Sequence, residues 1–291
     1  MSARDLLVLL VCCCAWGGNF VLVAWAAGTE RVPPLMLAAV RAAVVLAVMF
    51  PFLFRPRPEL FGRMLLVAAF IGPLHLAFLY TGLSMASASG GAIVSQMLIP
   101  MSTLLAVVFL GERLGWRRSL AIAAAFAGTI VILWEPGGVG LDPGLLIILA
   151  AYLWIAVGSI LMRSLGAVDW RIYVAWTAVL VLVAMTAASL VYESDHVSQA
   201  RSKWFPLTVS ALYAALAVSI FAHGQYFRLL GRYAVSVVVP ITLLVPVITV
   251  TLGLLFLDER LTLQILLGAA LILPGVYVIA KRDPVVSADH D

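Results

Sequence analysis

Charged residues are scarce in this sequence. Of its 291 residues only 11% are Asp, Glu, Lys or Arg, whereas 64% are apolar, and the mean hydropathy is +1.12. Soluble domains carry about 25% charged residues, so this chain has too few to cover a surface that faces water. The composition therefore predicts a protein whose solvent is largely lipid.

Sequence patterns for a disulfide, a metal site, ATP binding or catalysis are also missing. Cys12, Cys13 and Cys14 are adjacent, so on one helix they point in different directions and cannot form a disulfide with each other. The sequence has no Cys-x-x-Cys spacing for a metal and no Gly-Lys-Ser loop for ATP. A lipid-modifying enzyme within the membrane, the alternative from another class, needs a His/Asp/Glu cluster or an activated nucleophile. We therefore expect that the protein binds no metal and no cofactor, and that it is not an enzyme.

Apolar runs of about 20 residues, the length that crosses the hydrocarbon core, recur along the whole chain. Backbone groups find no partners in lipid, so these runs must be helices, and their lack of alternation argues against a barrel. The first run is too long for a secretory signal. We predict an all-α integral membrane protein with ten transmembrane helices, over Leu6–Ala27, Pro34–Phe54, Met64–Met85, Gly90–Leu110, Trp116–Trp134, Pro143–Leu165, Arg171–Tyr192, Phe205–Phe227, Val235–Leu257 and Thr262–Ala280.

The second half of the sequence repeats the first. Equivalent residues lie 146 positions apart up to Pro100 and 147 positions apart from Leu105 onward. Such repetition indicates duplication of a structural unit, and we place the repeats at 1–134 and 143–282, followed by a short tail at 283–291. The matched pairs include Tyr80 and Tyr226, Ala88 and Ala234, Pro100 and Pro246, Phe109 and Phe256, Glu112 and Glu259, Gly128 and Gly275, and Val131 and Val278.

Basic residues are distributed unequally between the two sides of the predicted spans. With the N-terminus inside, 13 Lys and Arg residues lie on the inner side and four lie on the outer side. The positive-inside rule then places both termini in the cytoplasm, and it explains the pI of 9.1 better than binding of nucleic acid does. Each half has five spans, an odd number, so the second half enters the membrane from the opposite side. Inverted repeats of this kind are a recurrent transporter architecture.

The motifs in both halves resemble those of the EamA-type transporters of the drug/metabolite transporter (DMT) superfamily. The resemblance covers essentially the whole chain. It rests on Trp16-Gly17-Gly18-Asn19-Phe20, on Pro33-Pro34-Leu35-Met36-Leu37-Ala38 leading to Arg41, on Gly111-Glu112-Arg113-Leu114, on Leu230-Gly231-Arg232-Tyr233, on Leu244-Val245-Pro246, and on Asp258-Glu259-Arg260-Leu261 followed by Gly268 and Gly275.

The resemblance implies a carrier whose helices 1, 3, 4, 6, 8 and 9 line a central cavity while helices 5 and 10 stand outside it. Within the superfamily the likeness is to bacterial exporters of cysteine-pathway metabolites such as O-acetylserine and cysteine. It implies export of amino acids or their derivatives across the cell inner membrane by alternating access. Export of aromatic amino acids or amphipathic drug-like compounds stays open as the alternative. A membrane lipid environment and a functional monomer are expected, because one chain carries both halves.

Polar groups are costly in hydrocarbon, so each one within a span is a candidate. Arg41 is the only basic residue deep within a span, where it either pairs with a substrate carboxylate or bonds carbonyls structurally. His75 and His223 lie in corresponding regions of the two halves and either contact substrate or pack. All 14 acidic residues fall in predicted loops, termini or span ends. A buried carboxylate is therefore unavailable for proton coupling, which favours facilitated diffusion over coupling through a histidine.

The remaining candidates are aromatic, amide and proline residues. Trp16 and Asn19 share one face of the first span, and Trp154 sits at a matching place in the second half, so the two tryptophans either clamp the substrate or pack between the halves. Tyr80 and Tyr226 either line the path or belong to the core. We also include Gln96 as a pathway residue and Pro100 and Pro246 as helix kinks. Glu112 and Glu259 are interpreted as elements of turns rather than of a gate.

Overall fold

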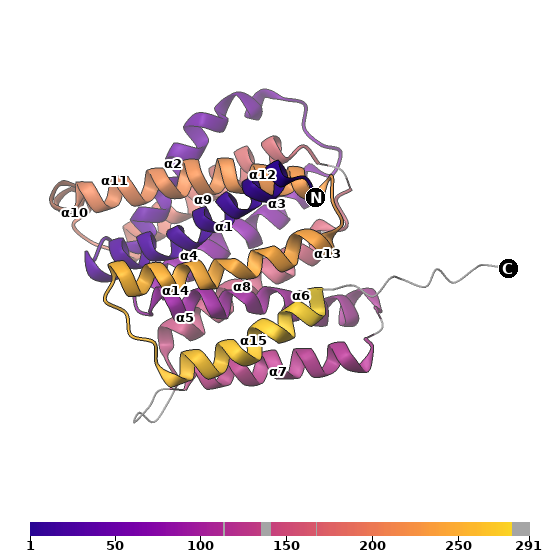
Figure 1. Ribbon diagram of the computed structural model, residues 1–291. Helices are drawn as coiled ribbons and strands as arrows, with labels where there is room; N and C mark the ends of the chain where they lie inside the picture. Colours follow the sequence, from indigo (N-terminus) through magenta and orange to yellow (C-terminus); the bar gives the residue numbers. More distant parts are fainter. Residues whose placement is uncertain (113, 135–140, 167, 281–291) are drawn as a thin grey trace.

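The computed structural model describes residues 1–112, 114–134, 141–166 and 168–280. Within these residues, ten helical spans are long and apolar enough to cross a membrane, which confirms the predicted all-α membrane fold (Figure 1). The predicted tail at 283–291, Arg113 and most of the connection between the halves lie outside the described residues. The spans are Ala3–Thr29, Pro34–Phe54, Phe61–Leu83, Ala88–Leu110, Trp116–Leu133, Pro143–Met162, Trp170–Tyr192, Trp204–Leu230, Val239–Phe256 and Leu263–Ala280.

Several spans are built from more than one helical segment. The first half consists of α1 (Ala3–Val23) and η1 (Ala24–Thr29), α2 (Pro34–Met49) and η2 (Phe50–Phe54), α3 (Phe61–Ala69), η3 (Phe70–Leu74) and α4 (His75–Leu83), α5 (Ala88–Val94), η4 (Ser95–Met97) and α6 (Leu98–Leu110), and α7 (Trp116–Leu133). The second half consists of α8 (Pro143–Met162), α9 (Trp170–Tyr192), α10 (His196–Ser202), α11 (Trp204–Leu212), η5 (Tyr213–Ala222) and α12 (His223–Leu230), α13 (Val235–Val238), η6 (Val239–Leu243) and α14 (Leu244–Phe256), and α15 (Leu263–Ala280).

Two kinds of irregular segment recur at corresponding places in the two halves. The third and eighth spans each contain a π-helical stretch, η3 and η5, and the fourth and ninth each contain a 3-10 stretch, η4 and η6. Pro100 and Pro246 occupy the third position of the 13-residue helices that follow these 3-10 stretches. Proline has no N–H to donate to the carbonyl four residues earlier, so the α-helical ladder is interrupted at the same point in both repeats.

The turns that carry Glu112 and Glu259 also share one backbone geometry. Gly111 and Asp258, the residues before the two glutamates, both adopt left-handed conformations, with φ of 67° and 52°. Glu112 N then donates to Ala106 O at 3.4 Å, and Glu259 N donates to the equivalent Gly253 O at 3.3 Å. Glycine takes the left-handed region without strain, whereas an aspartate there is a tolerated exception.

The packing of α7 against α15 shows how the two halves are related. A methyl group added at Gly128 would lie 2.8 Å from Gly268 O, and one added at Gly275 would lie 2.7 Å from Ala121 O. Contacts thus move toward the start of α15 as they move toward the end of α7, so the two helices are antiparallel and lie side by side (Figure 1). Gly275 is the repeat equivalent of Gly128, and Gly268 is the repeat equivalent of Ala121. When each residue is replaced by its equivalent, the first contact becomes the second, as expected for two repeats that are related by inversion in the membrane.

Several other helix contacts obey the same exchange. The α4 segment packs on α8, and its counterpart, formed by η5 and α12, packs on α1. Likewise α6 packs on α8 while α14 packs on α1, and α2 packs on its own counterpart α9. The main hydrophobic core is shared between the halves, for example where Tyr80 and Leu83 of α4 and Ile148 of α8 are fully buried together.

The ends of the bundle differ in charge. One end carries the start of α1 and three ion pairs, formed by Arg228 with Asp5, Arg163 with Glu112, and Arg55 with Asp169. We call this the arginine-rich end, and we call the other end, which carries the α1–α2 and α9–α11 connections, the far end. The far end also holds α10, which lies between the predicted spans Arg171–Tyr192 and Phe205–Phe227, where no helix was predicted.

Candidate functional site

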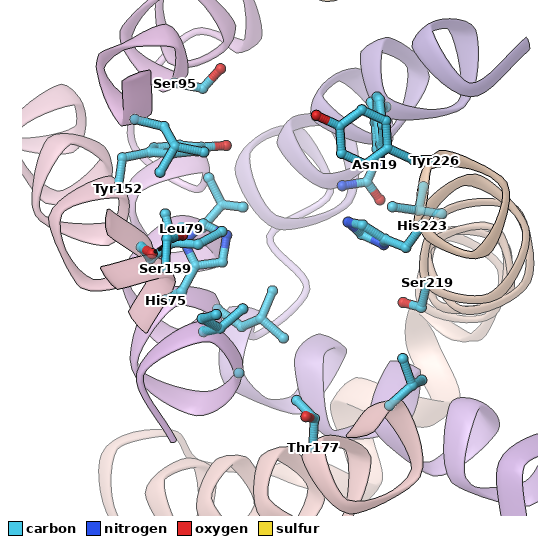
Figure 2. Close-up of a pocket in the computed structure, with 18 of the residues that line it drawn as sticks. Asn19, His75, Leu79, Ser95, Tyr152, Ser159, Thr177, Ser219, His223 and Tyr226 are labelled. Carbon is cyan, nitrogen blue, oxygen red and sulfur yellow. Dashed lines mark hydrogen bonds between the residues drawn. The ribbon is translucent and has the colours of Figure 1, made fainter. Parts of the chain in front are cut away.

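A cavity of about 580 Å³ lies between the two halves of the bundle. Its volume is within the range of about 300–1,000 Å³ that is usual for small-molecule sites. All spans except those of α7 and α15 contribute to its wall, as the family resemblance predicts for the lining helices, with α2 and α9 in addition. In Figure 2, Asn19, Ser219, His223 and Tyr226 face His75, Ser95, Tyr152 and Ser159 across the cavity, and Thr177 lies at its edge.

The cavity extends toward the arginine-rich end. There its lining includes Met162, the last residue of α8, Phe227 near the end of α12, and Val239 at the start of η6. Toward the far end the lining stops at Phe20 and Leu79, before the ends of their spans. The structure therefore shows a cavity that is displaced toward one end of the bundle.

Arg41 is the only charged residue in the cavity wall as the structure describes it. The side chain is buried, with 8% of its surface exposed. Its Nε and Nη2 atoms donate to Ser219 Oγ at 3.1 and 2.8 Å, and Nη1 donates to the Tyr80 hydroxyl at 3.0 Å. None of the ion pairs among the described residues involves Arg41, so its charge is held by neutral oxygens alone.

His75 is held by a carbonyl of the other half. Its Nδ1 lies 3.0 Å from Ala151 O on α8. A carbonyl oxygen only accepts, so Nδ1 carries the proton and Nε2 remains an acceptor in the neutral ring. The ring also packs edge-on against Tyr152, with centroids 5.2 Å apart. His75 therefore supplies an oriented acceptor group to the cavity wall.

An aromatic cluster forms the opposite wall. The Trp16 ring lies 5.7 Å from His223 and 5.2 Å from Tyr226, the latter in an edge-to-face arrangement. His223 and Tyr226 are three residues apart on α12, so they share one face. Such a surface suits the apolar part of a small ligand, because aromatic side chains bury a large apolar area and pack favourably on other rings.

Two amides add to the polar lining. Asn19, three residues after Trp16, has a buried Oδ1 with no hydrogen-bond partner among the described residues. Gln96 lies in η4, where its Nε2 donates to Ser95 Oγ at 3.3 Å. A buried acceptor without a partner costs about 1–3 kcal/mol, so the orphaned oxygen of Asn19 marks a place where a bound donor would be stabilising.

Some candidates from the sequence lie outside the lining. Tyr80 is fully buried behind Arg41, which it contacts, and its repeat equivalent Tyr226 lines the cavity instead. Trp154 packs on Phe70 and Phe78 at centroid distances of 5.9 and 6.3 Å and does not meet Trp16. Pro100 and Pro246 also lie outside the lining, and the helix kinks expected at them stay a prediction.

Other lining residues were not predicted from the sequence. Ser219 accepts two of the three hydrogen bonds of Arg41, and it donates to Ala214 O, five residues earlier, within the π-helical η5. Its spacing of four residues from His223 was the available signal, since such a pair shares a helix face. Ser159 and Thr177 bond their own helix carbonyls at 2.7 Å and carry no signal of this kind in the sequence.

No group of three or more His, Cys, Asp or Glu side chains is arranged to hold a metal ion within the described ranges. The cavity wall offers groups for binding: a guanidinium for an anionic group, acceptors at Asn19 and His75 for a donor, and aromatic rings for an apolar body.

Comparison with known proteins places this geometry in context. A model of the EamA-like transporter family matches residues 4–134 and again residues 142–281. The chain is 30% identical, over 96% of its length and 95% of theirs, to a "Probable amino-acid metabolite efflux pump" of Escherichia coli (strain K12) and to one of Salmonella typhimurium (strain LT2). A solved crystal structure of a protein shares the fold, with a TM-score of 0.59, 19% identity and 96% of each chain covered.

Proposed function

This chain belongs to the EamA-like transporter family, and we propose that it exports small amino-acid metabolites by alternating access. That it is a multi-pass membrane transporter rather than an enzyme follows from the family. The substrate class is our inference from the cavity, and the names of the two relatives at 30% identity agree with it. Cysteine-pathway metabolites or similar amino-acid derivatives are the proposed cargo.

The main support for this proposal is that the positive charge of Arg41 has no acidic partner among the described ion pairs. A guanidinium buried in a membrane protein is costly unless an anion accompanies it, and the described ion pairs do not include this residue. Three of its five N–H groups are used by Tyr80 and Ser219. The remaining two suit a carboxylate, which guanidinium groups bind with paired hydrogen bonds.

The opposite charge of an amino acid has its own place in the cavity. Asn19 Oδ1 on one wall and His75 Nε2 on the opposite wall are acceptors, and an ammonium group, which offers three donors, can bind at either of them. No carboxylate is present in the described cavity wall, so the site suits an ammonium without binding a lone amine strongly. Together these groups favour a zwitterion over a simple cation.

A second substrate class is favoured by one observation. Trp16, His223 and Tyr226 form a continuous aromatic surface in the wall, and most of the lining is apolar. Aromatic amino acids or amphipathic drug-like compounds would bury their rings there. This class remains the alternative: an aromatic amino acid would place its carboxylate at Arg41 in the same way, whereas an uncharged drug-like compound would leave that charge unpaired.

The energy source and topology form part of the same proposal. With no carboxylate in the described wall, transport is facilitated diffusion down the metabolite gradient rather than proton exchange. The arginine-rich end faces the cytoplasm of a bacterial inner membrane under the positive-inside rule, with both termini on that side. The repeats at 1–134 and 143–282 enclose one site, so a monomer is sufficient for transport.

The test is flux into proteoliposomes that contain the purified protein. A panel of radiolabelled compounds should include cysteine, O-acetylserine, an aromatic amino acid and the matching carboxamides. We expect uptake of zwitterions and little uptake of carboxamides. Absence of flux for every compound would refute the proposal, and flux of aromatic amino acids alone would favour the alternative.

A further inference from the structure

Glu259 fastens the second half of the chain to the first at the far end. Its Oε1 accepts from Ala88 N at 2.6 Å, and its Oε2 accepts from Ser89 N at 3.1 Å and from the Ser89 hydroxyl. Ala88 begins the span that runs to Leu110. The first N–H groups of a helix lack partners within the helix and carry partial positive charge, so a carboxylate stabilises this helix start by charge-assisted hydrogen bonds.

The repeat equivalent of this carboxylate is not docked in the same way. Glu112 is the counterpart of Glu259, and Ala234, immediately before α13, is the counterpart of Ala88. Glu112 Oε1 instead accepts from Arg163 Nη1 at 2.6 Å, in an ion pair whose side chains are about half exposed. One of two equivalent carboxylates therefore caps a helix of the other half, while the other one pairs with an arginine at the surface.

The position of the cavity is a second, independent asymmetry. Its lining reaches the end of the bundle where Glu112 lies and stops short of the end where Glu259 is docked. The undocked carboxylate thus coincides with the end toward which the cavity extends. The docked carboxylate coincides with the end at which the lining stops.

We propose that Glu259 and Glu112 are alternating latches. In the state described here, Glu259 bound to Ala88 and Ser89 closes the far end. In the opposite state, Glu112 leaves Arg163 and caps the start of α13, which closes the arginine-rich end, while Glu259 is released. This inference rests on the alternating access of the proposed function and adds the residues that hold each state.

The two latches are unequal, which sets the resting state. The docked carboxylate lies directly against Gly253, where an added methyl group would be 2.6 Å from Glu259 Oε2. The equivalent position in the first half is Ala106, which already has that methyl group, and the residue equivalent to Ser89 is Val235, which has no hydroxyl. The Glu112 latch therefore has less space and one donor fewer. The state with the Glu259 latch closed is accordingly the resting state.

The test measures both ends of the bundle at once in the purified full-length protein in lipid nanodiscs. After replacement of the three native cysteines by alanine, spin labels are attached in two pairs. Met85 and Leu263 report on the far end, and Leu110 and Val237 report on the arginine-rich end. All four side chains are exposed, by 58, 68, 47 and 44% respectively. Pulsed electron–electron double resonance then gives the distribution of distances between the two labels of each pair in the absence of substrate.

Glu259→Gln should lengthen the far-end distance and shorten the distance at the arginine-rich end. We expect the ratio of the two states to change about tenfold or more, which corresponds to about 1.4 kcal/mol. Gly253→Ala should act in the same direction by displacing the carboxylate. Glu112→Gln makes the same chemical change at the repeat equivalent and is the matched control, in which the far end should stay closed.

Unchanged distances in folded Glu259→Gln protein would overturn the proposal, as would the same response from both glutamine variants. If Glu259→Gln does not yield monodisperse protein, Ser89→Ala removes one donor and should give a smaller shift in the same direction; no shift there refutes the latch. The results also distinguish failure of the latch proposal from failure of the proposed function. Responsive distances without amino-acid flux would leave the latch intact and refute the substrate, whereas flux with unresponsive distances would refute the latch alone.

Discussion

Replacement of Arg41 by Gln is the most direct test of how the cavity recognises its substrate. The variant keeps a polar side chain but removes the only charge in the described wall and the donors available to a carboxylate. Loss of one partner from a buried, hydrogen-bonded charge pair costs about 2–5 kcal/mol. Because each 1.4 kcal/mol is a factor of ten, we expect affinity for an amino acid to fall about 30-fold or more.

The decisive readout is discrimination between an amino acid and its carboxamide. In the native protein the carboxamide should bind much more weakly, since it presents no charge to the guanidinium. In Arg41→Gln the two compounds should bind about equally, as measured by thermal shift and by competition in proteoliposome flux. An Arg41→Gln protein that still prefers the acid as strongly as the native chain does would refute the carboxylate role.

A structural role for Arg41 predicts a different result. The guanidinium joins α2 to Tyr80 on α4 and to Ser219 in η5, so its loss will also lower the melting temperature. Tyr80→Phe and Ser219→Ala remove these partners and leave the guanidinium in place. They should lower stability while preserving preference for the acid, and they are therefore the matched controls that separate positioning of Arg41 from contact with the substrate.

The remaining predictions concern packing, coupling and topology. Gly268→Ala should destabilise the protein by about 1–3 kcal/mol through overpacking, because the new methyl group would collide with Ile132 Cγ1. Gly62→Ala is the control: a methyl group added there would have nothing within 4 Å, so the melting temperature should not change. Flux should persist when the proton gradient is collapsed; strict dependence on the gradient would contradict facilitated diffusion. Single cysteines at Gly62 and Glu30, both exposed, should react with an impermeant maleimide from the cytoplasmic and external sides respectively.

Much of the architecture was predictable because lipid makes few alternatives acceptable. Ten apolar runs of sufficient length required ten helices, and the span Pro34–Phe54 agrees with the structure at both ends. The repeat also predicted that the two halves would be inverted, which the antiparallel contacts around Gly128 and Gly275 confirm. By contrast α10 (His196–Ser202) was missed, since a short polar helix has no apolar periodicity to reveal it.

The candidate site was harder to predict, because sequence periodicity gives the face of a helix but not its neighbour. The sequence placed Trp154 at a position in the second half that matches Trp16 in the first. In the structure, however, the Trp154 ring packs against Phe70 and Phe78. Ser219 was overlooked because a serine within an apolar helix ordinarily bonds its own backbone. Only the tertiary contact with Arg41 shows that this hydroxyl accepts two hydrogen bonds from a charged group.

The repeat itself separates the residues that move from those that bind. Where equivalent residues are identical and sit in turns of the same backbone geometry, as at Glu112 and Glu259, both copies can perform one task in turn, which is what alternation between two states requires. Where only one of two equivalent residues lines the cavity, that copy has become specific: Tyr80 is buried behind Arg41, while Tyr226 faces the cavity beside Trp16. Substitutions at the first kind of position should therefore shift the balance of states for every substrate alike, and substitutions at the second kind should change which substrate is carried.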